Sequence, residues 1–279
     1  MSDKPFIKAS KFSGLGNEIL LIDLIRQSGN LNSTSIKKIV KDKQADFDQL
    51  ISIEAPSSPN LDFSCRIFNK DGSQAENCIN GARCFAKYVI DSDLLDKKEL
   101  LIGVGEIEWR IVAHRKGDYS VEQLVSNISV GKDYLPKPNI NNLHELLVLK
   151  DTIEIAYINL GNPHAIYFTS KINNLPLDSW GTNLQTSRWF PMGVNLGLAE
   201  ISSRSKVNLR VFERGVGETL ACGSGACATV ILGNCLGLLE EEVEVCFKKG
   251  SLFVKYDQKN RKLNARGTAK FLKEITIPL

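Results

Sequence analysis

The sequence has little excess charge, no long apolar run and no recognisable export signal. Its 279 residues carry a formal net charge of only +3, which is too small to indicate nucleic acid or a membrane surface as a partner. No apolar stretch reaches the roughly 18 residues of a membrane-spanning helix, and the first ten residues lack the apolar core of a signal peptide. We therefore expect a globular protein that is soluble in water.

The cysteines also lack the pattern of a disulfide framework or of a zinc site. There are seven, an odd number, in a chain that is long enough to fold without covalent crosslinks. Zinc sites usually contain closely spaced pairs such as C-x-x-C, whereas the close spacings here are Cys78 to Cys84 and Cys222 to Cys227. We expect reduced thiols in a cytoplasmic protein, without a bound metal.

The most informative stretch is residues 213–228, which read ERGVGETLACGSGACA. Cys222 is followed by a Gly-Ser-Gly turn and then by an apolar, alanine-rich run that predicts a helix. The backbone N–H groups that open a helix are unpaired and lie at the positive end of its dipole, where a carboxylate can bind. A cysteine at this position is predicted to have its thiol pKa lowered below the usual value of about 8.5.

The same pattern occurs twice in the chain. The motif R-x-F, followed ten residues later by a cysteine, occupies residues 66–78 and again residues 210–222, at an offset of 144. Both cysteines continue as C-x-x-G-A, and the tripeptide L-G-N recurs at 15–17 and 160–162, at an offset of 145. Because these offsets nearly agree, we infer that the chain contains two copies of one structural unit.

Each copy combines many short strands with one long helix. Helices are predicted at residues 34–43, at 80–90 and from Gly223 onward. Strands are predicted in both copies, at residues 6–10, 19–25, 49–53, 63–69, 100–104, 106–113, 119–124, 153–159, 164–170, 194–201, 208–213, 243–247, 252–256, 262–266 and 269–277. This content favours an α+β protein with two pseudo-symmetric domains, in each of which a mostly antiparallel β-sheet wraps around a central α-helix.

Two copies related by a pseudo-two-fold axis would bring Cys78 and Cys222 to opposite sides of one substrate carbon, in a cleft between the domains. A thiolate on one side would remove the α-proton, and the thiol opposite would deliver a proton to the other face, which inverts the stereocentre. Cysteine suits this chemistry because its pKa can be set close to ambient pH. No G-x-G-x-x-G loop follows a strand and no pyridoxal-phosphate lysine site is recognisable, so no cofactor is expected.

The motifs NKDGSQAENCINGARC, GNPHAI and RVFERGVGETLACGSGACA make the chain resemble the diaminopimelate epimerase family, from Lys11 to the C-terminus. The resemblance implies a cofactor-independent, two-base isomerase that interconverts L,L- and meso-diaminopimelate for lysine and peptidoglycan synthesis. It also implies a homodimer and two domains, of residues 1–125 plus 269–279 and of residues 126–268.

By the same resemblance, Cys78 and Cys222 are the acid/base pair, assisted by His164 and Glu213 respectively. The resemblance also implies substrate contacts through the side chains of Asn17, Gln49, Asn69, Asn162, Asn195, Glu213 and Arg214. It implies that the backbone N–H groups of Ile79, Asn80, Gly223 and Ser224 bind the α-carboxylate. An arginine fork suits the distal carboxylate of diaminopimelate.

The chain departs from the family pattern at several positions. Ile79 stands where glycine is usual, and because a β-branched residue rarely adopts positive φ, this loop must be in an ordinary conformation or shifted. We expect altered substrate affinity there, and retained chemistry. The other departures are Ser13 for histidine, Glu18 for aspartate, Ile102 for threonine and Met192–Gly193 for a Glu-Arg pair, and the last is expected to loosen Asn195.

Three alternatives remain open from the sequence. The first is an epimerase or racemase of another amino acid on the same fold, such as a proline racemase-like enzyme, although Arg214 and the asparagines disfavour a small apolar substrate. The second is a non-catalytic descendant that binds an amino acid. The third is a redox-sensing dithiol formed by Cys78 and Cys222.

Overall fold

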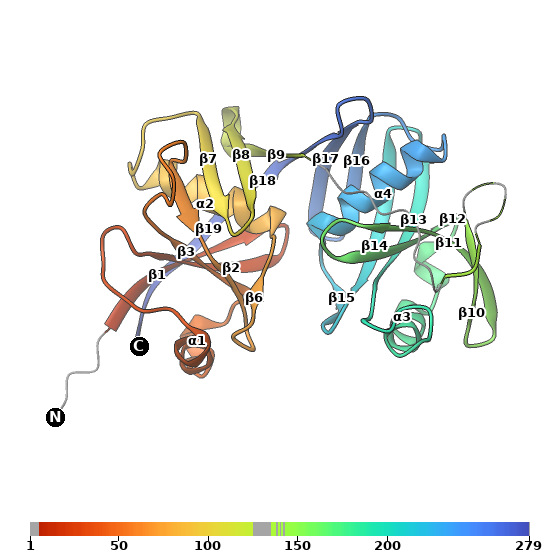
Figure 1. The fold of residues 1–279 in the computed structure, drawn as a ribbon, viewed down its shortest axis with the longest axis horizontal. Helices are drawn as coiled ribbons and strands as arrows, with labels where there is room; N and C mark the ends of the chain where they lie inside the picture. The colour runs from red at the N-terminus through yellow and green to blue at the C-terminus, as the bar shows by residue number, and fades with distance from the viewer. Residues whose placement is uncertain (1–5, 125–134, 138, 140, 142, 279) are drawn as a thin grey trace. The chain divides into compact units, whose positions relative to one another are not determined.

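The computed structural model describes residues 6–124, 135–137, 139, 141 and 143–278. The chain divides into two compact units, Met1–Gln123 with Arg266–Leu279, and Leu124–Ala265. The expected boundary at 125 lies outside the described residues, and the expected boundary at 268 lies a few residues beyond the observed one. The identity of the units as epimerase-like domains stays a prediction, and each unit is described by itself below (Figure 1).

The first unit contains two sheets around helix α2 (Ile79–Asp91). One sheet has the strand order β19-β1-β2-β3-β5-β6, and the strands of the other follow in the order β9-β8-β7-β4. The bounds are β1 Phe6–Gly14, β2 Asn17–Asp23, α1 Ser33–Ile39, η1 Lys43–Ala45, β3 Gln49–Ile53, β4 Phe63–Cys65, β5 Ile67–Asn69, β6 Gln74–Ala75, β7 Glu99–Val104, β8 Ile107–Ala113, η2 Arg115–Gly117, β9 Asp118–Leu124 and β19 Lys270–Pro278. Helix α2 contacts β1, β2, β3 and β19 of the first sheet and β8 of the second.

The second unit is built in the same way around helix α4 (Gly223–Cys235). Its strands follow in the order β10-β11-β12-β13-β14-β16-β17-β18, and β15 pairs with β14. The bounds are β10 His144–Val148, β11 Asp151–Asn159, β12 Pro163–Thr169, η3 Ile172–Asn174, α3 Leu177–Gln185, β13 Asn195–Ser203, β14 Lys206–Glu213, β15 Gly217–Thr219, β16 Glu242–Phe247, β17 Gly250–Asp257 and β18 Lys262–Thr268. Helix α4 contacts strands β11, β12, β13, β16 and β17.

The two central helices are buried for different sequence reasons. Helix α4 is apolar nearly all around, and its residues from Gly225 to Gly233 are buried without interruption, as expected for a helix enclosed by a sheet. Helix α2 is amphipathic and buries Arg83 completely. The guanidinium of Arg83 donates to Asn80 Oδ1 at 2.7 Å and to the carbonyls of Ile79 and Thr268 at 3.3 and 3.4 Å, which compensates its loss of water.

The strand registers reproduce the internal repeat. Ile67 pairs with Ala75 between β5 and β6, and Val211 pairs with Thr219 between β14 and β15. In the first sheet β2 runs parallel to β3, and this pair corresponds to the parallel pair of β12 with β13. Figure 1 shows each central helix among the strands of its own unit and the shorter helix, α1 or α3, at the border of its sheet.

The predicted α+β class, with mostly antiparallel sheets around central helices, is confirmed. Two predicted elements differ: the strand 63–69 is broken at Arg66 into β4 and β5, which pair with β7 and β3 in different sheets, and the helix 34–43 ends at Ile39. Helix α3 and strand β10 were not predicted. Helix α3 contains Gly181, and glycine disfavours a helix interior. The glycine is needed because a Cβ there would lie 2.2 Å from the ring of Phe212.

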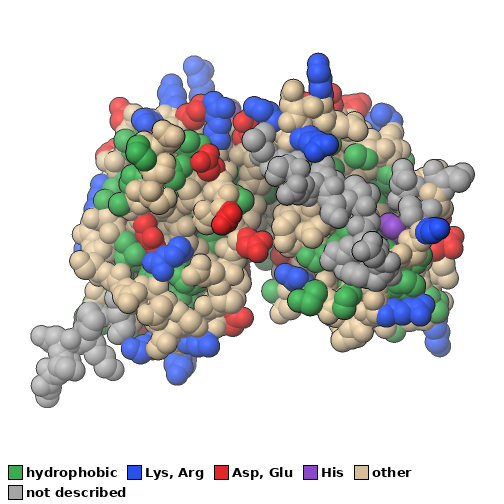
Figure 2. All heavy atoms as spheres, in the orientation of Figure 1, with side chains coloured by type: hydrophobic (Ala, Val, Ile, Leu, Met, Phe, Trp, Pro, Cys, Tyr) green, Lys and Arg blue, Asp and Glu red, His purple; other side chains and the backbone are tan. Residues whose placement is uncertain are grey.

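The described surface agrees with the small net charge. Figure 2 shows lysine and arginine side chains interspersed with aspartate and glutamate on the visible face of each unit. Within the residues that the structure describes, no helix is long and apolar enough to cross a membrane.

Candidate functional site

Both candidate cysteines are the N-cap residues of the central helices. The Cys78 sulfur accepts a hydrogen bond from the N–H of Gly81 at 3.1 Å at the start of α2. The Cys222 sulfur accepts one from the N–H of Gly225 at 3.4 Å at the start of α4. The predicted placement of each cysteine at a helix N-terminus is thereby confirmed, and in both units the sulfur satisfies one of the unpaired donors that open the helix.

The glycine of each C-x-x-G motif is required by the sulfur next to it. A Cβ on Gly81 would lie 3.1 Å from the Cys78 sulfur and 2.3 Å from Ile51 Cδ1, and a Cβ on Gly225 would lie 3.3 Å from the Cys222 sulfur. A larger residue would therefore displace the thiol. Ile79, by contrast, is the first helical residue of α2 and has no positive φ, so the loop has a backbone conformation that a β-branched residue adopts without strain.

The surroundings of Cys222 raise its thiol pKa. Cys222 is only 3% exposed, and burial, followed by the Glu213 carboxylate, raises the pKa well above its ordinary value, although hydrogen bonds from Ser224 and Gly225 act in the opposite direction. The predicted lowering of the pKa is therefore wrong for Cys222, because desolvation outweighs the two donors. At neutral pH this group is a thiol.

Strands β13 to β15 hold Glu213, Arg214 and Asn195 close to one another. Thr219 donates from Oγ1 to Glu213 Oε1 at 2.5 Å. The backbone N–H of Arg214 donates to Asn195 Oδ1 at 2.9 Å, and Asn195 Nδ2 donates to the carbonyl of Pro163 at 2.9 Å. Asn195 is therefore fixed at both ends and 4% exposed, so the expectation that the departure at Met192–Gly193 loosens it is wrong.

His164 is part of a hydrogen-bonded chain that reaches the Cys222 loop. Its Nε2 lies 3.1 Å from Asn162 Oδ1, Asn162 Nδ2 donates to Ser224 Oγ at 3.3 Å, and Ser224 Oγ lies 3.5 Å from the Cys222 sulfur. Because an amide oxygen only accepts, His164 Nε2 carries the proton. Complete burial, with a contribution from the charge of Arg214, lowers the pKa of His164 to about 3, so its imidazole is neutral near pH 7.

In the first unit, the amide of Asn17 lies near Cys78. Its sulfur lies 4.0 Å from Asn17 Oδ1, in the turn between β1 and β2. Asp48 fixes this turn by accepting from Asn17 Nδ2 at 3.4 Å and from the N–H of Glu18 at 2.8 Å. Ser13, where the family has histidine, accepts from the N–H of Gly16 at 3.1 Å, so it has a structural role in the same turn.

Gln49 and Asn69 are adjacent on paired strands. Gln49 Nε2 donates to Asn69 Oδ1 at 3.0 Å, and Asn69 Nδ2 donates to Ser73 Oγ at 3.1 Å. The side chain of Asn80 is 4% exposed and binds Arg83, which leaves its backbone N–H as the group that could meet a ligand. The structure therefore brings Asn17 to Cys78 and pairs Gln49 with Asn69 in the first unit, and it links Asn162, Ser224 and Glu213 to Cys222 in the second.

Comparison with known proteins identifies the family. The family model described as diaminopimelate epimerase matches residues 9–122 and 156–272. A protein of Nitrosomonas europaea named diaminopimelate epimerase is 36% identical over 98% of this chain and 99% of its own length. One of Teredinibacter turnerae with the same name is 35% identical over 95% of this chain and 96% of its own length. This chain belongs to the diaminopimelate epimerase family.

Solved structures share the fold of this diaminopimelate epimerase family member at low sequence identity. A PhzF-family phenazine biosynthesis protein of Bacillus anthracis has a TM-score of 0.70 at 14% identity and covers 99% of this chain and 100% of its own. A hydroxyproline epimerase of Agrobacterium vitis has a TM-score of 0.70 at 10% identity and covers 100% of this chain and 94% of its own. At these identities the likeness concerns the fold alone.

Sequence reasoning missed the residues that support the candidate side chains. Asp48 directly precedes Gln49, and Thr219 and the hydroxyl of Ser224 lie inside the family motif around Cys222, but their partners are visible only in three dimensions. Among the described residues, no group of three or more histidine, cysteine, aspartate or glutamate side chains is arranged to hold a metal ion.

Proposed function

We propose that this protein interconverts L,L- and meso-diaminopimelate by cofactor-independent, two-base epimerisation, with Cys78 and Cys222 as the acid/base pair. Membership of the family supports the substrate. The observation that carries the mechanism is that each unit presents one cysteine as the N-cap of its central helix, with the sulfur on a backbone N–H. Reactive thiols and bound carboxylates both favour this position.

The chemistry requires both sulfurs to act on one carbon. The Cys78 thiolate takes the α-proton, the C–H bond breaks, and the Cys222 thiol gives its proton to the opposite face. Turnover leaves Cys78 as thiol and Cys222 as thiolate, which is the starting state of the reverse reaction. We assign Cys222 as the thiol at rest because burial and Glu213 raise its pKa.

Backbone and side-chain groups bind the substrate and its developing charge. The N–H groups of Ile79, Asn80, Gly223 and Ser224 are assigned to the α-carboxylate, where negative charge builds as the proton leaves. Arg214 is assigned to the distal carboxylate. The side-chain amides are assigned to polar groups at the two ends of the substrate; they belong to Asn17, Gln49, Asn69, Asn162 and Asn195.

Glu213 and His164 are assigned supporting roles in proton transfer. Together with burial, which is the larger cause, the Glu213 carboxylate raises the pKa of Cys222 and so helps to keep it protonated until the thiol is needed. His164 is neutral and therefore assists Cys78 as a hydrogen-bonding group, without a charge.

We also infer a homodimer in the cytoplasm, without cofactor or metal. The support for these features is the family resemblance together with the reduced-thiol composition of the sequence. Light scattering measures the oligomer, and activity after dialysis against a chelator tests the absence of a metal. A monomer in solution, or activity that a chelator removes, would contradict this part of the proposal.

The test is an epimerisation assay with L,L-diaminopimelate and L-proline on the wild type, Cys78→Ala, Cys222→Ala and the control Cys235→Ala. Cys235 is exposed at the far end of α4. We expect turnover of diaminopimelate and not of proline, a loss of about 10²- to 10⁴-fold in the first two variants, and little change in the third. Binding without turnover by the wild type, or full activity of either alanine variant, would overturn the proposal.

A further inference from the structure

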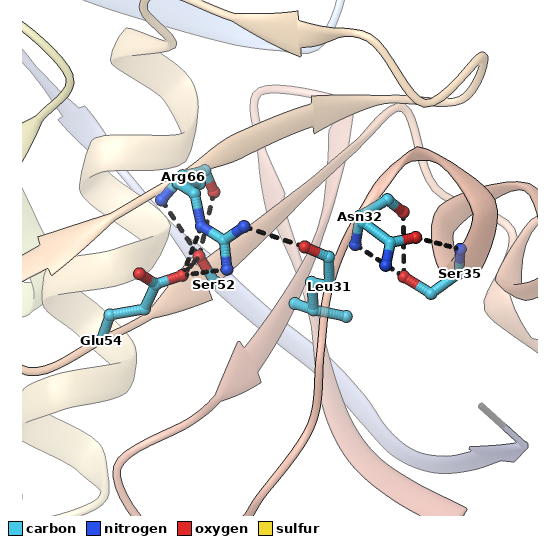
Figure 3. Close-up of polar contacts among 6 residues, drawn as sticks. All are labelled: Leu31, Asn32, Ser35, Ser52, Glu54 and Arg66. Carbon is cyan, nitrogen blue, oxygen red and sulfur yellow. Dashed lines mark hydrogen bonds and ion pairs between the residues drawn. The ribbon is translucent and has the colours of Figure 1, made fainter.

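The arginine of the repeated R-x-F motif makes a comparable set of bonds in both units, and no role has yet been given to it. In the first unit, Arg66 donates from Nε and Nη2 to Glu54 Oε1 at 2.8 and 2.7 Å. Its Nη1 donates to the carbonyl of Leu31 at 2.8 Å. Figure 3 shows that Leu31 directly precedes Asn32, the N-cap of α1, so Arg66 anchors the chain where α1 begins.

Arg210 does the same in the second unit, with better geometry. Its Nε and Nη2 donate to the two carboxylate oxygens of Glu218 at 2.9 and 2.8 Å, which is the bidentate arrangement. Its Nη1 donates to the carbonyls of Ile172 and Leu175 at 2.7 and 3.3 Å, just before α3. Both side chains are more buried than the pair in the first unit, 16% and 20% exposed against 36% and 27%.

The two arginines differ in where the carboxylate comes from. Glu54 follows strand β3, which pairs with one edge of β5. The segment that leads to Cys78 begins with β6, which pairs with the other edge of β5. Glu218 lies in β15, four residues before Cys222, and its neighbour Thr219 holds Glu213. The strand register places Gln74 at the corresponding position of the first unit, and this residue is exposed and carries no charge.

The tip of the β14–β15 hairpin makes few contacts. Its turn contains Gly215 and Gly217 at φ of 75° and 107°, and a Cβ on either would meet no described atom within 4 Å. Val216, between them, is 75% exposed. Since the tip makes so little contact, the hairpin is held at its base, by the pairing of β14 with β15 and by the ion pairs of Glu218 with Arg210 and, at 3.6 Å, with Lys248.

We propose that Arg210 and Glu218 are positioning residues, which fix the β14–β15 hairpin and through it Glu213 and Cys222, whereas the counterpart Arg66 stabilises its unit without acting on Cys78. This inference rests on the proposed function for its effect on turnover. Loss of Arg210 leaves two carbonyls without their donor and leaves the half-buried carboxylate of Glu218 with Lys248 alone, whose Nζ lies 3.6 Å from Oε1, a situation that favours rearrangement of the hairpin. Lysine cannot restore both arms of the fork.

The test compares Arg210→Gln, Arg210→Lys and Glu218→Gln with the matched control Arg66→Gln. We call the Arg210–Glu218 pair the clamp. Arg210→Gln and Glu218→Gln should each lose on the order of 10- to 100-fold in kcat/KM, since small misplacements of catalytic groups have such effects. Arg210→Lys should recover only part of this loss. Arg66→Gln should keep kcat/KM within about twofold while its melting temperature falls, because its partner Glu54 lies outside the segment that leads from β6 to Cys78.

A second readout separates positioning from general loss of structure. The pH dependence of Cys222 alkylation, followed by mass spectrometry, should shift to lower pH in Arg210→Gln and Glu218→Gln, because a displaced Glu213 no longer raises the thiol pKa. It should not shift in Arg66→Gln.

Unchanged turnover and an unchanged alkylation profile in the Arg210 and Glu218 variants, or equal effects of Arg66→Gln, would overturn the inference. If the wild type does not epimerise diaminopimelate, the proposed function fails, and the alkylation profiles still decide on the clamp. If Arg210→Gln does not fold, the more conservative Glu218→Gln decides.

Discussion

The two units share a backbone plan but differ in the charge around their cysteines. Cys222 is buried, with Glu213 acting on its thiol and a neutral His164 connected to it through Asn162 and Ser224. Cys78 is half-buried and lies near the amide of Asn17. Both units keep the helix caps, and the second adds a carboxylate that acts on its cysteine and an imidazole linked to it.

Corresponding positions make this difference explicit. By the offset of 144 that relates the two cysteines, Asn69 is the counterpart of Glu213 in the repeat. In the two parallel strand pairs, Ile19 is the counterpart of His164. A carboxylate and an imidazole in the second unit thus correspond to an amide and an aliphatic side chain in the first. The two units therefore share the helix-cap scaffold and differ in the side chains at these positions.

The largest effect should come from removing the carboxylate that distinguishes the two thiols. Glu213→Gln should lower kcat by about 10²- to 10³-fold, as for a group that assists proton transfer. It should also shift Cys222 alkylation to lower pH, because Glu213 raises that pKa in the wild type. Stopped assays and alkylation profiles measure both. An alkylation profile that stays in place or moves to higher pH would contradict the assigned role.

Next in size is the effect of adding a methyl group beside each sulfur. Gly81→Ala should destabilise by up to about 3 kcal/mol, because the Cβ would lie 2.3 Å from the buried Ile51. Gly225→Ala meets its nearest atom at 3.1 Å, and alanine gains about 1 kcal/mol in a helix. It should therefore lose activity with little loss of stability. Denaturant unfolding and kcat/KM test this, and equal stability losses would contradict it.

The pH dependence of stability should report the buried His164. Above pH 6.5 its imidazole is neutral in both states, so it has no effect. Below that value the unfolded chain takes up a proton that the folded chain, with a pKa of about 3, does not. Stability should therefore fall by about 1.4 kcal/mol per pH unit, or about 2 kcal/mol at pH 5. This share of the loss should be absent in His164→Gln, and identical pH profiles for the two proteins would contradict the assignment.

The smallest effect on turnover should follow from placing glycine at position 79. Ile79→Gly should cost about 1 kcal/mol in helix propensity and a further loss of about 2 to 5 kcal/mol through lost burial, since Ile79 is 5% exposed. Its backbone N–H remains, so kcat should change less than twofold and only KM should respond. A tenfold change in kcat would show that the side chain itself affects the reaction.

Local patterns were enough to predict much of the fold. The helix caps at both cysteines and the strand at 49–53 follow from residues close in sequence, and the internal repeat follows from matching two such local motifs. The break at Arg66 was not predictable, because it depends on the bonds of Arg66 to Glu54 and Leu31, which are distant in the chain. Helix α3 was missed because Pro176 gives it no side-chain cap and Gly181 is explained only by the ring of Phe212.

The sequence was enough to predict which residues belong to the candidate site, but not the pKa values of their side chains. The motif around Cys222 indicated a helix N-terminus and hence a lowered pKa, but the opposing desolvation depends on the sheet that encloses α4. The supporting residues Asp48 and Thr219 likewise act through contacts that no spacing rule predicts. Arg210 is the intermediate case, because the repeat singled it out while its partner Glu218 appeared only in the structure.

The most direct measurement is the early distribution of label when L,L-diaminopimelate is turned over in D₂O. The account predicts that the first meso product carries deuterium at the inverted carbon while the recovered L,L substrate remains unlabelled, because one sulfur removes the proton and another delivers solvent deuterium. Equal labelling of substrate and product, or product that keeps the original proton, would mean that a single group works on both faces and would contradict the two-cysteine account.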